Sequence, residues 1–99
     1  MLYQATKKVT GGKLVRVKIM ADEYINDIQI SGDFFLHPED SLIQIEQNLR
    51  NLHKDSTPEE INARIDTALA KENGTFIGLT TEDLTQTIIE ALQHARSEE

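Results

Sequence analysis

Cysteine is entirely absent from this sequence of 99 residues. Disulfide bonds, thiolate nucleophiles and cysteine-ligated zinc or iron–sulfur centres are therefore excluded. The sequence also lacks an apolar run of the roughly 18–20 residues that a membrane-spanning helix needs. Its first residues contain no apolar segment of the kind found in signal peptides. We therefore expect a soluble, cytoplasmic protein that does not interact with a membrane.

Acidic residues are absent from the first 21 positions, which hold five lysines and arginines. The rest of the chain holds the other five basic residues and all 17 acidic ones, so the net charge is −7. Because nucleic-acid affinity requires clustered cations, this acidic composition argues against a nucleic-acid partner. The basic segment remains available to one anionic ligand or to an acidic partner. Solvent-facing charges on a pair of strands would give the same pattern.

Alternating apolar and basic residues predict a strand in LVRVKIM (14–20). Its odd-numbered residues point to one side, whereas Arg16 and Lys18 point to the other. After a short polar connection, YINDIQIS (24–31) supplies the second strand of an antiparallel hairpin. The first seven residues can add a third strand along one edge. The residues of the second strand that we expect on the inner face are Tyr24, Ile28 and Ile30.

Helical spacing replaces the strand pattern after Gly32. A first helix begins near Ser41, and a second has Thr57 as its cap, Pro58 in its first turn and Gly74 as its left-handed end. Residues 75–79 are expected to be an apolar connector before a third helix. The inner stripes of the first and third helices are predicted to be Leu42, Ile45, Leu49 and Leu52, and Leu84, Ile88, Leu92 and Ala95.

The order of the predicted elements indicates the fold class. Strands that precede helices, rather than alternate with them, are typical of an α+β fold. We therefore expect a small antiparallel sheet of two to three strands followed by three helices packed on one face. The length suits one domain and leaves no room for a second core.

The segment Gly11-Gly12-Lys13 does not form a phosphate-binding P-loop. That motif lies between a strand and a helix and ends in Lys-Ser or Lys-Thr, whereas here the glycines open a strand and Leu14 follows the lysine. The loop amides and Lys13 could approach one anionic group of a ligand held mainly by another protein. A plain turn would use the same glycines.

The segment SGDFFLHPED (31–40) gathers one histidine and three acidic residues around Phe34 and Phe35. Adjacent residues on an extended segment face opposite sides, so both phenylalanines cannot enter one core. One of them should lie at an interface, or the segment should kink. The acidic residues suit the start of a helix better than a metal site, which needs ligands that converge. An independent enzyme built on His37 is the least favoured hypothesis, so we predict neither a catalytic nor a metal site.

Three motifs carry a resemblance to a known family. They are GGKLVRV (11–17), ISGDFF (30–35) and a late F-x-G-x-T formed by Phe76, Gly78 and Thr80. In this order they resemble the C-terminal accessory domain of lipoate–protein ligases. The chain is similar over essentially its whole length to the stand-alone small subunit of archaeal two-component ligases. The resemblance implies a SufE/NifU-like fold in which residues 1–99 are a single accessory domain.

The resemblance also implies a function. The chain would be a non-catalytic subunit with no activity alone, in a heterodimer with a large catalytic subunit that carries the ATP, Mg and lipoate sites. Both subunits would be needed to form lipoyl-AMP, before the lipoyl group is transferred to a lysine of a lipoyl domain. No cofactor would be bound by this chain. Iron–sulfur scaffold proteins, which share the implied fold, use cysteines that are missing here.

An alternative function of the chain remains open, and the family motifs indicate two groups of site residues. The alternative is that the chain is a stand-alone interaction module, which would recognise lipoyl-domain acceptor proteins and have no part in adenylation. The residues expected near the adenylate are Gly11, Gly12 and Lys13. The residues expected at the subunit interface are Arg16, Lys18, Asp33, Phe34 and Phe35.

Overall fold

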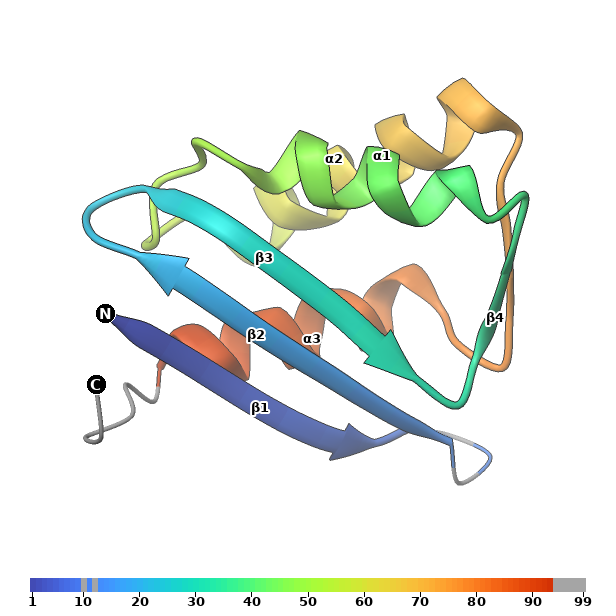
Figure 1. The fold of residues 1–99 in the computed structure, drawn as a ribbon, viewed down its shortest axis with the longest axis horizontal. Helices are drawn as coiled ribbons and strands as arrows, with labels where there is room; N and C mark the ends of the chain where they lie inside the picture. The colour runs from blue at the N-terminus through green and yellow to red at the C-terminus, as the bar shows by residue number, and fades with distance from the viewer. Residues whose placement is uncertain (10, 12, 94–99) are drawn as a thin grey trace.

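Three antiparallel strands form one layer of the computed structural model, which describes residues 1–9, 11 and 13–93 (Figure 1). β1 (Leu2–Lys8), β2 (Leu14–Ala21) and β3 (Ile25–Gly32) lie side by side in chain order. In the central strand β2, the odd-numbered residues are buried and Arg16 and Lys18 are exposed. The predicted hairpin and its third strand are therefore confirmed.

Tyr24 does not face the core, so its predicted position is wrong. Its side chain is 50% exposed, and the neighbouring Ile25 is fully buried in its place. The pairing of β2 with β3 shifts between Met20 and Ala21, which leaves Asn26 as an extra residue on β3. An extra residue reverses the alternation of side chains along a strand. The two other predicted inner residues of β3 lie beyond this bulge and are buried as expected.

Helices α1 (Asp40–Leu49), α2 (Pro58–Glu72) and α3 (Thr81–Leu92) pack on one side of the sheet. α3 packs against β1 and β2, α1 packs against β3, and α2 packs against both helices. Figure 1 shows α3 behind the sheet, and no helix of the described residues covers the face turned to the viewer. This is the predicted α+β arrangement. The largest side chains of its core are Ile19, Ile25, Ile28, Ile45, Leu49, Ile61, Ile65, Leu84 and Ile88.

Side-chain caps begin the second and third helices. The hydroxyl of Thr57 accepts a hydrogen bond from the backbone N–H of Glu60 at 3.2 Å, as the sequence predicts. The hydroxyl of Thr80 accepts one from the N–H of Asp83 at 3.0 Å. Such caps satisfy backbone donors that have no partner inside the helix. Thr80 therefore links the late F-x-G-x-T motif to the start of α3.

The predicted ends of two helices are wrong. α1 stops at Leu49, so Leu52 is buried outside the helix, where its carbonyl accepts a hydrogen bond from the N–H of Ile25 at 2.8 Å. Asn73, with φ of 51°, ends α2 in the left-handed conformation in place of Gly74. Gly74 serves close packing instead, because a Cβ there would lie 2.7 Å from a side-chain oxygen of α1.

A second, two-stranded sheet joins the end of the main sheet to the helices. β4 (Phe35–His37) pairs with β5 (Thr75–Ile77) in antiparallel register, with Phe35 opposite Ile77. Figure 1 shows β4 along one end of the molecule, running from the end of β3 to the start of α1. The sequence did not predict this pairing, since residues 75–79 were expected to be a connector. The pairing places the segment of the two phenylalanines against the segment of the late F-x-G-x-T motif.

Candidate functional site

Three segments far apart in the sequence meet at one corner of the molecule. We call it the motif corner and define it by Lys13, Leu14, Gly32, Asp33 and Gly78. The N–H of Asp33 donates a hydrogen bond to the carbonyl of Leu14 at 2.9 Å. A Cβ at Gly32 would lie 2.1 Å from the same carbonyl oxygen, so only glycine fits there without a backbone shift. These contacts hold the end of β3 against the start of β2.

Lys13 is positioned at both its backbone and its side chain. Its carbonyl accepts a hydrogen bond from the N–H of Val9 at 2.8 Å. Its aliphatic stem lies along Gly78, where a Cβ would stand 3.4 Å from Cγ and 3.6 Å from Cε of the lysine. Because Lys13 is exposed, this contact holds the stem while the ammonium group stays in water. The first and third family motifs therefore touch through this lysine.

Glycine is needed in the preceding loop for its backbone rather than for packing. Gly11 has a φ of 91°, and no atom lies within 4 Å of the Cβ that another residue would carry. Only glycine adopts this conformation at little cost. Gly12, the other predicted glycine of the loop, lies outside the described residues.

Phe34 and Phe35 point to different surroundings, as the sequence predicts. Phe34 is half-buried and packs edge-on against Phe76, with ring centroids 5.9 Å apart. Phe35 is 64% exposed and pairs across the small sheet with Ile77, which is 53% exposed. A groove of about 490 Å³ runs from Phe35 to the half-exposed Ile43 of α1. We call this surface the apolar groove and define it by Phe34, Phe35, Leu36, Leu42 and Ile43.

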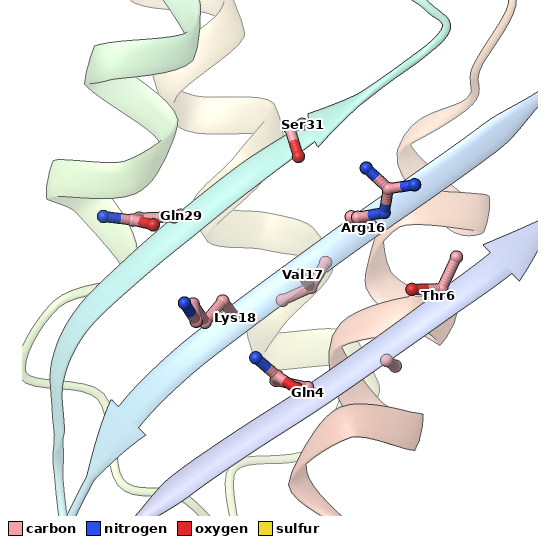
Figure 2. A pocket seen from close by; sticks show the side chains of 8 residues that line it. Gln4, Thr6, Arg16, Val17, Lys18, Gln29 and Ser31 are labelled. Atoms are coloured by element: carbon pink, nitrogen blue, oxygen red, sulfur yellow. The ribbon is translucent and has the colours of Figure 1, made fainter.

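The uncovered side of the main sheet carries a second, polar surface (Figure 2). Arg16 and Lys18 both project from β2 on this side. The register places Arg16 between Thr6 and Ser31, and it places Lys18 between two glutamines. A hollow of about 390 Å³ lies among these side chains. We call this surface the open sheet face and define it by Gln4, Thr6, Arg16, Lys18, Gln29 and Ser31.

The two surfaces are continuous. Ser31 lines the hollow of the open sheet face and also the apolar groove. Asp33 is exposed and lies between Ser31 and the phenylalanines in the chain. The structure therefore brings the predicted interface residues onto one connected surface, with Lys13 at its corner.

The basic residues of the N-terminal segment do not all share one environment. Lys7 faces the helices and forms an ion pair with Glu90 of α3. Among the described residues, Lys8, Lys13, Arg16 and Lys18 form no ion pair. Four of the five N-terminal cations thus remain available to a partner.

Sequence reasoning missed three residues of these surfaces. Gly78 belongs to a quoted motif, but its contact with Lys13 depends on a fold that brings residues 13 and 78 together. Ile43 lies off the inner stripe of its helix, and this offset could have marked it as an exposed apolar residue. Ile77 lies in a short apolar segment whose pattern does not show which side chain faces outward.

Two other kinds of feature are absent from the described residues. No helix among them is long and apolar enough to cross a membrane. No group of three histidine, aspartate or glutamate side chains among them is arranged to hold a metal ion. The histidine and acidic residues of segment 31–40 therefore form no such group.

Comparison with known proteins gives two similar chains from Thermoplasma acidophilum. The chain is 44% identical over 63 residues to Lipoate-protein ligase A subunit 2, a match that covers 63% of this chain and 62% of the relative. It thus spans less than two thirds of that relative's length. A chain from the solved structure of an archaeal lipoylation system, described as a bi-partite lipoate protein ligase and its E2 lipoyl domain, is 35% identical with a TM-score of 0.71. That alignment covers 89% of this chain and 94% of the other. No family model matches the sequence.

Proposed function

Because the chain belongs to the family of lipoate–protein ligase small subunits, we propose that it is the accessory subunit of a two-component lipoate–protein ligase. It would form a cytoplasmic heterodimer with a large catalytic subunit and would have no activity alone. ATP, Mg and lipoate would bind to that large subunit. The observation that carries the proposal is family membership, combined with the convergence of the family motifs at one corner.

The proposed reaction has two steps. The carboxylate oxygen of lipoate attacks the α-phosphorus of ATP, which forms lipoyl-AMP and releases pyrophosphate. The amino group of a lipoyl-domain lysine then attacks the acyl carbon, which forms an amide and releases AMP. The chain would be required for the first step. In the transition state of that step, the negative charge on the phosphates is distributed differently from the charge in ATP. A cation positioned where charge develops stabilises the transition state and so accelerates the step.

Lys13 is the cation that this chain offers for adenylation. Its stem lies beside Gly78 and its carbonyl accepts a hydrogen bond from Val9, which places the start of its side chain at the motif corner. We propose that docking brings this group to the mouth of the active site of the large subunit. Gly11 and Gly12 would let the loop approach the adenylate closely, because they present no side chain.

The apolar groove and the residues beside it form the proposed contact with the large subunit. Phe35 is a large apolar side chain left in water by this chain, and exposed aromatic residues are common anchors of protein interfaces. Phe34 and Asp33 extend this contact toward the motif corner. Arg16 and Lys18 extend it onto the open sheet face.

One assay tests the proposed function. Lipoate-dependent exchange between ATP and pyrophosphate would be measured for the large subunit alone, for this chain alone and for the mixture. We expect exchange only in the mixture. Exchange by the large subunit alone, with this chain affecting only transfer to the lipoyl domain, would contradict the proposal and would support acceptor recognition instead. Exchange by this chain alone would contradict both.

A further inference from the structure

The open sheet face places two cations side by side, and neither forms an ion pair among the described residues. Residues two apart on a strand lie on the same face and are separated by roughly 7 Å, so Arg16 and Lys18 repel each other weakly. Their cross-strand neighbours are two hydroxyl and two amide side chains, as Figure 2 shows. All four neighbours can donate hydrogen bonds to an anion. The surface is therefore equipped for carboxylate or phosphate groups.

The rest of the chain makes this arrangement distinctive. Of the other cations, Lys7 is paired with Glu90, and Arg50 is paired with Asp27 at 3.0 Å. Asp27 of β3 shares the outer side of the sheet and lines a neighbouring hollow together with Lys18, but its carboxylate is engaged by Arg50. Among the described residues, Arg16 and Lys18 thus stand as neighbouring unpaired cations on a chain whose net charge is −7.

The shape of the face favours a protein partner. It is one side of a three-stranded sheet, and small molecules are usually held in concave sites that bury most of their surface. A nucleic acid would be repelled by the net negative charge of the whole chain. The carboxylates of an acidic protein surface can reach Arg16 and Lys18 at once, because both side chains project from the uncovered side of the sheet.

The connection between the apolar groove and the open sheet face indicates which protein would bind the open sheet face. Ser31 lines both the apolar groove and the open sheet face, so a partner seated on the groove also reaches Arg16. We propose that the large subunit covers the open sheet face with an acidic surface whose carboxylates bind Arg16 and Lys18. This inference rests on the proposed function and adds the chemistry of the partner surface to it.

The test measures the dissociation constant of the two subunits as a function of salt concentration. Replacing both cations, Arg16→Glu with Lys18→Glu, should raise the dissociation constant about 100-fold at low salt, mainly through slower association. Raising the salt from 50 to 500 mM should weaken the native complex and reduce the difference between native and variant. Circular dichroism would show that the variant is folded, since both side chains are exposed.

A matched control separates a local contact from net charge. Lys54→Glu with Lys71→Glu makes the same change of charge in the connection before α2 and in the last turn of α2, at two lysines that do not line the open sheet face. Its dissociation constant should change less than threefold. Equal effects of the two variants would overturn the inference, as would an unchanged dissociation constant in the Arg16 and Lys18 variant. A variant that binds normally but raises the KM for the lipoyl domain would also overturn it and assign the face to the acceptor.

The proposed function and this inference fail in distinguishable ways. If the native pair neither associates nor catalyses lipoate-dependent exchange, the proposed function is wrong. If the native pair does both and the charge reversal leaves association unchanged, only the inference about the open sheet face is wrong.

Discussion

Lys13 shows how glycine residues can orient a charged side chain without touching its charge. Gly32 lets β3 lie against the carbonyl of Leu14, and Gly78 lets the lysine stem lie flat on the connection before α3. Gly11 has a different task, because its backbone conformation alone requires glycine. The position of the lysine stem is therefore a property of the fold rather than of the loop alone.

Substitutions of Lys13 separate its charge from its packing. Lys13→Met keeps an aliphatic stem against Gly78 and removes the charge, whereas Lys13→Arg keeps the charge. We expect Lys13→Met and Lys13→Ala to slow lipoyl-AMP formation about tenfold, which corresponds to about 1.4 kcal/mol of transition-state stabilisation. Lys13→Arg should retain most of the activity. Lipoate-dependent pyrophosphate exchange at saturating subunit concentration measures these effects.

The control for Lys13 is another exposed lysine. Lys71→Ala on α2 should leave exchange unchanged, and all Lys13 variants should bind the large subunit with the native affinity. Normal exchange by both Lys13→Met and Lys13→Ala would reject a role in adenylation. Loss of activity through weaker binding would show that the residue is an interface contact.

Among the secondary-structure elements, α1 and β3 are joined by a side chain that closes a sheet edge. Glu46 of α1 accepts a hydrogen bond from the outward-facing N–H of Ile30 at 2.9 Å. Edge strands otherwise leave such donors free to pair with other chains. Burial raises the pKa of the Glu46 carboxyl above its ordinary value of 4.5, and the bond from Ile30 opposes this rise. Asp27 raises the same pKa further, and Arg50 lowers it.

This raised pKa predicts the pH dependence of stability. At a pH between the ordinary and the raised pKa, Glu46 binds more protons in the folded chain than in the unfolded chain. The contribution of this group to the free energy of unfolding therefore falls as the pH rises from about 4.5 through the raised pKa. Glu46→Gln keeps an oxygen that can accept from Ile30 and removes the charge. Relative to native protein, this variant should therefore gain stability as the pH rises, as measured by urea unfolding between pH 4 and pH 8.

The control is a carboxyl on the surface of another element. Glu59→Gln in the first turn of α2 should not reproduce this pH-dependent gain, because Glu59 is exposed and lies outside the sheet. A difference between Glu46→Gln and native protein that stayed constant with pH would contradict the assignment. A variant with lower stability at every pH would show that the hydrogen bond itself requires the charged carboxylate.

Local patterns were enough to predict the main elements but not their pairing at long range. The alternation in β2, the Thr57 cap and the buried stripe residues Ile45, Leu49, Leu84 and Ile88 depend on neighbouring residues and were confirmed. Ala95, which was predicted for the stripe of the third helix, lies outside the described residues. The pairing of β4 with β5 joins residues 35–37 to residues 75–77 and depends on the packing of the helices between them. The bulge in β3 likewise follows from the pairing of two strands, and periodicity in one strand does not reveal it.

The same distinction between local pattern and long-range packing applies to the candidate site. Sequence reasoning selected Lys13, Arg16, Lys18 and the two phenylalanines because they lie in the family motifs or in the N-terminal segment that has no acidic residue. It could not show that Gly78 supports Lys13, since that contact needs the chain to return after 65 residues. The exposure of Phe35 was predicted only as one of two possibilities, because period-two geometry assigns the pair to opposite sides without saying which side is the core.

The whole molecule joins an apolar surface to a basic one, because Ser31 lines both the apolar groove and the open sheet face. Apolar contacts at a protein interface mainly slow dissociation, whereas charged contacts mainly speed association. If the apolar groove and the open sheet face serve one partner, variants of the two surfaces should therefore differ in kinetics. The groove should determine how long the complex lasts, and the open face should determine how fast it forms.

Phe35→Ser tests the contribution of the groove. The side chain is 64% exposed, so its loss should reduce the stability of the isolated chain by less than about 1 kcal/mol, in line with other surface substitutions. In the complex, loss of a buried aromatic anchor should raise the dissociation constant about 30-fold or more, chiefly through faster dissociation. Surface plasmon resonance with the immobilised large subunit measures both rates.

Tyr24→Ser removes an aromatic residue that is 50% exposed at the opposite end of β3 and should leave both rates unchanged. If Phe35→Ser had no larger effect than Tyr24→Ser, the large subunit would have to bind elsewhere on the chain.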